Sequence, residues 1–206
     1  LSKLVMFSTL TVAAVIVAGL IVFFTGAFDS TLAEDNGTGV QASADVIPGA
    51  NDAGVSPVFF PGYHSVGNPA SQAHFEKAWD TELCDQPGMN LNVMMKELGT
   101  GIRGLFVMGE DIVLSEPNAG RVEEGLNEIE FLVMQDIFPN ETMRFADVIL
   151  PAACFAEKEG VFTNSDRRVQ RVRKAVEPPG MARADWEIIC DLSRAAGYPM
   201  PEYSHP

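Results

Sequence analysis

"GLFVMGEDIVLSEPNAGRVEEGLNEIEFLVMQD", residues 104–136, is the stretch that decides the fold. It begins with a short apolar run bounded by glycine, residues 104–109, and ends with a second apolar run, residues 131–136. Short apolar runs between turn residues are typical of buried strands. Residues 119–130 carry a helical pattern, and this alternation predicts a parallel β-α-β unit.

The sequence around this unit continues the alternation of strands and helices. "DVILP", residues 147–151, predicts a third strand that stops at a proline. Helices are expected over four further segments: 74–80, 91–101, 140–146 and 184–197. We therefore predict an α/β domain over residues 58–206, built on an open, mainly parallel, doubly wound sheet. Residues 34–57, which lack periodicity, are expected to be a linker.

An apolar segment precedes this domain, within residues 1–33. From Leu4 to Phe28 no residue is charged, and about 20 apolar residues are enough to span a bilayer as a helix. A secretory signal usually has a shorter apolar core, of about 7–15 residues. The segment therefore favours an apolar N-terminal helix that anchors the protein to a membrane. A diverged, buried core helix with its strand, in a cytoplasmic protein, is the alternative.

Composition argues against some classes of function. The chain has 28 acidic and 14 basic residues and a net charge of −14 at pH 7. A field of that sign repels nucleic acid and argues against a nucleic-acid-binding protein. The three cysteines, Cys84, Cys154 and Cys190, are far apart in the sequence, so their spacing predicts neither a metal site nor a disulfide framework.

Polar residues follow the first two predicted strands, where ligands usually bind in open α/β sheets. The residues at these ends are Gly109, Glu110, Asp111 and Ser115 on the first strand, and Gln135 and Asp136 on the second. Carboxylates can accept hydrogen bonds from ribose hydroxyls or from the N–H groups of guanine or a pterin. The usual dinucleotide and P-loop motifs are missing. The alternative is that Asp111 and Asp136 cap the helices that follow them.

Longer segments carry a resemblance to a known family. They are "FVMGEDIVLSEPN" (106–118), the stretch from "FLVMQDIFPNETMRFADVILP" to "RVRKAVEPPG" (131–180), and "ARADWEIICDLSRAAGYPM" (182–200). Together with residues 49–63 and 75–91, they resemble the molybdopterin oxidoreductase superfamily, and within it the catalytic alpha subunits of formate dehydrogenases. The resemblance is ordered along the chain, which makes it more specific than any single motif.

This resemblance implies a cofactor and residues that bind it. The segment would form an α/β domain that cradles one arm of a bis(molybdopterin guanine dinucleotide) cofactor holding molybdenum or tungsten. The strand-end residues named above would bind this arm. Asp185, from the Asp-Trp pair that opens the last helix, would contact guanine or ribose. Ala152 stands where relatives have a small residue that contacts the cofactor. No catalytic or metal-ligating residue is assigned to this chain.

The resemblance also gives a role to the loop expected after the third strand, "AEKEGVFTNSDRRVQ" (156–170). In the family this loop runs beside the cofactor, so Asn164 and Arg167 or Arg168 would support the cofactor or a neighbouring domain. The basic run over 167–174 can pair with cofactor phosphates or with acidic neighbours. A solvated strand edge is the alternative for this run.

The chain also departs from the family. Complete family enzymes are several times longer and begin with an iron–sulfur domain that is not in this sequence, so no iron–sulfur cluster is expected on this chain. Ala42 aligns with the arginine that would hold formate, and a methyl group cannot replace a bidentate guanidinium. We therefore expect a cofactor-binding portion that is inactive alone and works with other segments or subunits of an oxidoreductase. The alternative is a non-catalytic, possibly membrane-anchored module that assembles with a redox complex.

Overall fold

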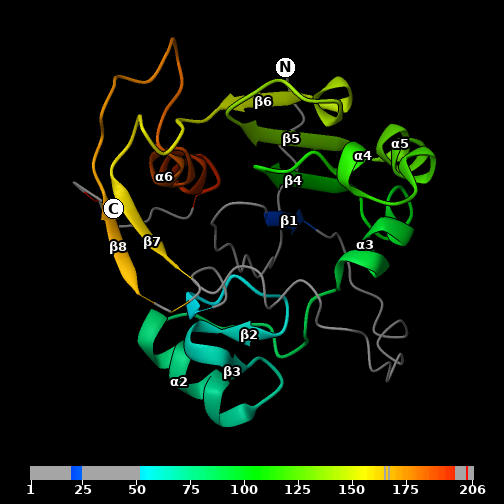
Figure 1. The fold of residues 1–206 in the computed structure, drawn as a ribbon. Helices are drawn as coiled ribbons and strands as arrows, with labels where there is room; N and C mark the ends of the chain where they lie inside the picture. Colours follow the sequence, from blue (N-terminus) through cyan, green and yellow to red (C-terminus); the bar gives the residue numbers. More distant parts are fainter. Residues whose placement is uncertain (1–19, 25–51, 165, 167, 198–202, 204–206) are drawn as a thin grey trace.

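The computed structural model describes residues 20–24, 52–164, 166, 168–197 and 203, and a four-stranded sheet lies at its centre (Figure 1). The strands, in their order across the sheet, are β1 (Leu20–Phe24), β4 (Gly104–Met108), β5 (Phe131–Asp136) and β6 (Val148–Pro151). Strands β4, β5 and β6 are parallel to one another. They lie where the sequence predicts strands, so the prediction of a mainly parallel sheet is confirmed.

The N-terminal apolar segment does not form the continuous helix expected over Leu4 to Phe28. Residues 20–24 of this segment form β1, which pairs antiparallel with β4, with Leu20 opposite Met108. The β1 sequence "LIVFF" is rich in β-branched and aromatic residues, which favour strands. Among the described residues no helix is long and apolar enough to cross a membrane. The rest of the apolar segment, and Ala42, lie outside the described residues.

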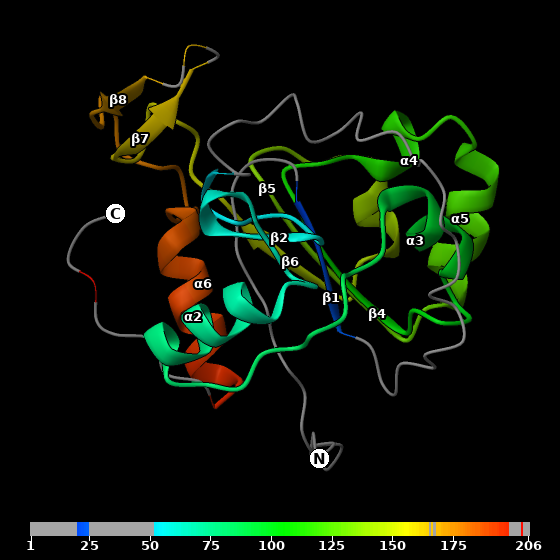
Figure 2. The same cartoon turned by 90° about the horizontal axis from the view of Figure 1, so that it is seen from below.

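Three helices cover one face of the sheet (Figure 2). They are α3 (Leu91–Glu97), α4 (Ile112–Ser115) and α5 (Ala119–Glu128). The core between these helices and the sheet contains Met94, Met95, Leu105, Val107, Val122, Leu126, Leu132 and Met134. The sequence predicted α3 and α5, although α3 ends at Glu97 rather than at the later glycine. It missed α4, which is too short to show a helical period.

Helix α6 (Asp185–Ala195) lies on the other side of the sheet in Figure 2. A second apolar cluster contains Phe106, Met108 and Val133, with Leu150 packed against it. Side chains along a strand point alternately to its two faces, so this cluster lies opposite the one under α3, α4 and α5. Helices on both sides agree with the doubly wound arrangement that the sequence predicts.

A small unit lies below the sheet in Figure 1. It comprises β2 (Phe59–Phe60), the short 3-10 helix η2 (Pro61–Tyr63), β3 (His64–Ser65) and α2 (Pro69–Trp79). Phe60, Val66 and Phe75 form its buried core, and the ring centroids of Phe60 and Phe75 are 4.9 Å apart. Helix α2 begins at Asn68, whose side chain accepts a hydrogen bond from the Ala70 N–H at 2.9 Å.

The chain after β5 forms a 3-10 helix and then, beyond β6, a hairpin. The 3-10 helix η3 (Thr142–Phe145) lies between β5 and β6, and the hairpin is formed by β7 (Gly160–Thr163) and β8 (Val169–Val172). The helical turn predicted over 140–146 is confirmed by η3. A loop was predicted over 156–170, with a solvated strand edge as the alternative for 167–174, and the mostly exposed strand β8 agrees with that alternative. Asn164 explains the difference from a loop, because its side-chain oxygen accepts hydrogen bonds from the backbone N–H groups of Asp166 at 3.0 Å and Arg168 at 2.9 Å. Asparagine stabilises tight turns in this way.

Candidate functional site

The carboxyl ends of the parallel strands meet at one edge of the sheet. The register places Met108 beside Gln135. Just beyond β4, the Gly109 N–H donates to the Gln135 carbonyl at 2.8 Å, and beyond β6 the Ala152 N–H donates to the Asp136 carbonyl at 3.0 Å. Gly109 has a φ of 65°, a conformation that glycine adopts without steric cost. The structure therefore brings the two predicted strand ends together.

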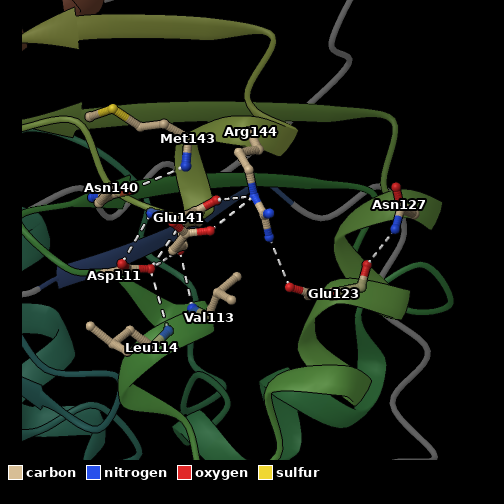
Figure 3. Close-up of polar contacts among 10 residues, drawn as sticks. Asp111, Val113, Leu114, Glu123, Asn127, Asn140, Glu141, Met143 and Arg144 are labelled. Carbon is tan, nitrogen blue, oxygen red and sulfur yellow. Dashed lines mark hydrogen bonds and ion pairs between the residues drawn. The ribbon is translucent and has the colours of Figure 1, made fainter.

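Asp111 is engaged in contacts within the protein (Figure 3). Its carboxylate accepts hydrogen bonds from the Thr142 hydroxyl at 2.7 Å and the Thr142 N–H at 3.2 Å. It also accepts from the N–H groups of Glu141 at 3.1 Å and Leu114 at 3.4 Å. Burial raises the pKa of the Asp111 carboxyl, but these hydrogen bonds outweigh burial and lower its pKa below the ordinary value. Asp111 thus caps α4, as the alternative reading predicted, and ties this helix to η3.

Asp136 makes fewer contacts than Asp111. Its carboxylate accepts hydrogen bonds from the Ile137 N–H at 2.6 Å and from the Asn140 side-chain amide at 2.8 Å. The Asn140 oxygen in turn accepts from the Met143 N–H at 3.1 Å, within η3. A carboxylate offers about four acceptor positions, so the half-buried Asp136 retains capacity for a further donor.

Glu110 and Ser115 lie near the same end of β4. Glu110 is half-buried, whereas Ser115, the last residue of α4, is exposed. The pKa of the nearby Glu116 is raised, first by its own burial and then by the negative charge of Glu110. Glu110 therefore adds a negative charge to this edge of the sheet.

Gln135 is the most deeply buried polar residue among the predicted site residues, with no exposed surface. Its amide nitrogen donates to one Asp185 oxygen at 2.8 Å. Its amide oxygen is buried and has no hydrogen-bond partner among the residues that the structure describes. Most buried polar groups are paired, and an unpaired one costs about 1–3 kcal/mol. Gln135 therefore presents an unfilled acceptor at the end of β5.

Lys158, on the segment between β6 and β7, completes this arrangement. Its ammonium group pairs with the second oxygen of Asp185, at the start of α6. The side chains are 22% exposed for Lys158 and 23% for Asp185. The sequence prediction missed Lys158, because it considered the loop over 156–170 as a whole and only its asparagine and arginines as contacts. The lysine in "EKEG" was the available signal.

Backbone contacts hold α6 against the end of β6. Ala152 forms an isolated parallel bridge with Arg183. The Ala153 N–H donates to the Arg183 carbonyl at 2.7 Å, and the Arg183 N–H donates to the Pro151 carbonyl at 3.2 Å. Ala152 and Ala153 are buried. This pairing carries the chain into α6 and so places Asp185 next to the strand ends.

Two members of the basic run pair with acidic neighbours, one of the two roles that the sequence suggested. Arg171 contacts Glu159 at 3.0 Å, and Lys174 contacts Glu177 at 2.6 Å. Arg171 and Glu159 are 62% and 45% exposed. Such surface pairs contribute little stability. Arg167 lies outside the described residues.

A cavity lies apart from the strand-end network. The cavity, of about 590 Å³, lies between α3 and the start of α5, and it is lined by Asn92, Met95, Lys96, Glu116, Pro117, Asn118, Arg121 and Val122. It shares no residue with the network of Gln135, Asp185 and Lys158. Within the described part of the chain, no three His, Cys, Asp or Glu side chains are grouped so that they could hold a metal ion.

Comparison with known proteins shows the family of the chain. The model of the molybdopterin oxidoreductase family matches residues 11–195. The F420-dependent formate dehydrogenase subunit alpha of Methanocaldococcus jannaschii is 46% identical over 164 residues, which cover 79% of this chain and 24% of that protein. Formate dehydrogenase H of Escherichia coli is 38% identical over 156 residues, covering 75% of this chain and 22% of that protein.

A relative with a different name matches almost as well. The assimilatory nitrate reductase catalytic subunit of Bacillus subtilis is 41% identical over 153 residues, which cover 72% of this chain and 21% of that protein. The chain thus spans about a quarter of the length of these relatives. The family model covers most of the chain and several formate dehydrogenase alpha subunits are about 40% identical to it, so the chain belongs to the molybdopterin oxidoreductase family and is formate dehydrogenase-like.

Proposed function

We propose that this chain is a cofactor-binding portion of a molybdenum- or tungsten-dependent oxidoreductase. In this proposal the carboxyl ends of β4 and β5 and the start of α6 bind one arm of a bis(molybdopterin guanine dinucleotide) cofactor. The family implies a molybdopterin cofactor, and ligands of open α/β sheets lie at this edge. The observation that carries the proposal is the buried amide oxygen of Gln135 at the same edge, which no group in the described part of the chain pairs.

The residues present fit such a group. A pterin and a guanine both carry N–H donors, and the Gln135 oxygen and the Asp136 carboxylate have acceptor capacity for them. Gly109, in its left-handed conformation, has no side chain to keep a ligand from the backbone. Asp111, which the sequence placed among the ligands, would instead organise the loop through its contacts to Thr142. Ser115, exposed at the end of α4, and Glu110 complete the proposed set.

The chemistry is divided between the cofactor and the chain. When bound, the metal of the cofactor supplies the redox chemistry of the family. The residues of this chain would bind and orient the dinucleotide arm and exclude water from its polar edge. No side chain of this segment needs to exchange a proton with a substrate for that role.

The relatives support a role in cofactor binding rather than substrate selection. The segment is shared at similar identity by formate dehydrogenase subunits and by a nitrate reductase subunit. These relatives are named for different substrates, but their family implies a shared molybdopterin cofactor. A segment that they have in common is therefore better explained by cofactor binding than by substrate binding. We propose that the substrate is selected by other segments or subunits, which would also carry the metal ligands and any iron–sulfur cluster.

The test is the cofactor content of the purified protein that carries this chain, as wild type and as Asp136→Ala. Metal is measured by mass spectrometry and guanine nucleotide as GMP released by acid hydrolysis. We expect Asp136→Ala to lower both, because the cofactor would lose a polar partner worth about 1–3 kcal/mol. Asp85→Ala, which removes an exposed carboxylate after α2, is the matched control and should retain both. Equal content in wild type and Asp136→Ala would contradict the proposed site.

A further inference from the structure

The ion pair between Lys158 and Asp185 is unusual for its burial. Each side chain is less than one quarter exposed, whereas Arg103 and Glu130, in a typical surface pair of this protein, are both 59% exposed. Removing charges from water is costly unless the pair is well placed and hydrogen-bonded. Here the pair is extended by a third group, because Asp185 also accepts the hydrogen bond from Gln135.

The contacts from Lys158 to Asp185 and from Asp185 to Gln135 fix the orientation of the Gln135 amide. An amide can present either its oxygen or its nitrogen, and the hydrogen-bond network decides between the two orientations. If the amide were reversed, its oxygen would face the Asp185 carboxylate, and two acceptors would repel each other. Lys158 holds the Asp185 carboxylate in place through their ion pair, and Asp185 keeps the amide nitrogen of Gln135 directed toward itself. The amide oxygen is then left as the free acceptor.

We infer that Lys158 is a positioning residue, which acts through Asp185 to present the Gln135 oxygen to a ligand N–H. The ligand chemistry that fits is the 2-amino-4-oxopyrimidine edge, which has a ring N–H beside an amino group. Guanine and pterin share this edge, and adenine has no ring N–H beside its amino group. A charged partner also strengthens the amide as an acceptor, since hydrogen bonds in a chain polarise one another. This inference rests on the proposed function of the strand-end site.

The experiment measures selectivity as well as content. The purified protein carrying this chain is prepared without cofactor and titrated with GMP, AMP and biopterin, as wild type, Lys158→Met, Lys158→Arg and Lys174→Met. We expect the wild type to prefer GMP, biopterin or both over AMP. Lys158→Met should lower that preference about tenfold, the effect of one lost hydrogen bond to a buried partner. Lys158→Arg keeps a cation and should restore it, and Lys174→Met, which removes an exposed lysine, should not change it.

The titrations distinguish guanine from pterin as the ligand of Gln135, and a positioning role of Lys158 from a merely structural one. Preference for GMP alone would assign Gln135 to the guanine, and preference for biopterin alone would assign it to the pterin. A merely structural role of Lys158 would weaken binding of all three probes equally and leave the preference unchanged, and that result would overturn the inference. If Lys158→Met does not fold, Asp185→Asn serves instead, because a neutral amide no longer fixes the Gln135 orientation and the preference should again fall.

Failure of the inference is distinguishable from failure of the proposed function. Wild-type protein that purifies with cofactor, together with a Lys158→Met variant of unchanged preference, leaves the proposed function standing and removes the positioning role. Wild-type protein that purifies without cofactor from a host that makes it, and that binds GMP and biopterin no better than AMP, overturns both.

Discussion

Asp111 and Asp136 occupy similar places in the sequence, since each ends an apolar strand and stands before a helical turn. Their surroundings differ. The donors that reach Asp111 from Glu141 and Thr142 come from about 30 residues away along the chain, whereas both donors to Asp136 lie within four residues. A carboxylate that caps a helix and one that keeps acceptor capacity for a further donor are the same residue type, so the sequence alone could not separate them.

The contacts of Asp111 predict a large effect on stability. Asp111→Ala removes the α4 cap and leaves the buried Thr142 hydroxyl without its acceptor. We expect the free energy of unfolding to fall by about 2–4 kcal/mol. Chemical denaturation followed by circular dichroism measures this change. Glu124→Ala removes an exposed carboxylate from α5 and should change the stability by less than about 0.5 kcal/mol.

The pH dependence of the same variant gives an internal check. The pKa of Asp111 is lower in the folded protein than its ordinary value, so its carboxylate stabilises the fold above the ordinary carboxyl pKa of about 4. This stabilisation is lost as the pH falls through the folded pKa. The difference between wild type and Asp111→Ala should therefore be constant near pH 7 and shrink below about pH 4. A difference that stays the same down to pH 2 would contradict the assigned role.

At the scale of elements, hydrophobic patterns in the sequence predicted the helices and strands whose formation depends on neighbouring residues. Strands β4, β5 and β6 each carry a short apolar run, and helices α3, α5 and α6 carry a helical pattern, so these elements were found from the sequence. Strands β1 and β8 were expected only in the alternatives for the apolar segment and the basic run, and β7 was missed, because the position of a strand in a sheet depends on its partner. Strand β1 pairs with residues 80 to 88 positions later, and no local pattern reports such a pairing.

The contact between α3 and α5 depends on a residue without a side chain. A Cβ added at Gly125, which is buried on α5, would lie 2.5 Å from the Leu98 Cβ. We expect Gly125→Ala to destabilise the protein by about 1–2 kcal/mol, since overpacking costs about 1–3 kcal/mol and the gain in helix propensity offsets up to about 1 kcal/mol. Thermal unfolding of the variant checks this.

The same helix offers the control for this substitution. A Cβ at Gly120 would meet only the Asn118 side-chain oxygen, at 3.9 Å. Gly120→Ala should therefore leave the stability unchanged or raise it by less than about 1 kcal/mol. Equal free energies of unfolding for Gly125→Ala and Gly120→Ala would contradict the close packing of α3 on α5 at Gly125.

At the scale of the whole molecule, the candidate site is assembled from distant parts of the chain. Gln135 and Asp185 are 50 residues apart, and Lys158 and Asp185 are 27 apart. The sequence predicted Gln135 from its place at a strand end and Asp185 from the family resemblance. It missed Lys158, because only the folded chain brings the segment before β7 against the start of α6.

The length of the relatives predicts how the chain behaves alone. The chain covers about a quarter of these two relatives, and the family resemblance predicts that Ala42 stands in place of the arginine that would hold formate. We expect the isolated chain, supplied with cofactor and a redox dye, to show no formate-dependent reduction of the dye. An anaerobic spectrophotometric assay measures this, with a complete formate dehydrogenase as the positive control. Reduction above the level without formate would contradict the assignment of catalysis to other segments.

Hydrogen exchange tests most directly whether the strand ends hold the cofactor. The protein that carries this chain is prepared with cofactor and, from a host unable to make it, without cofactor, and amide exchange is compared by mass spectrometry. We expect slower exchange in the loaded protein in peptides covering 109–115, 135–140, 152–158 and 183–188. Peptides of the small unit at 59–79 serve as the internal reference and should exchange alike in both. Unchanged exchange at all four strand-end segments, in a protein whose cofactor content is verified, would contradict cofactor binding at the strand ends.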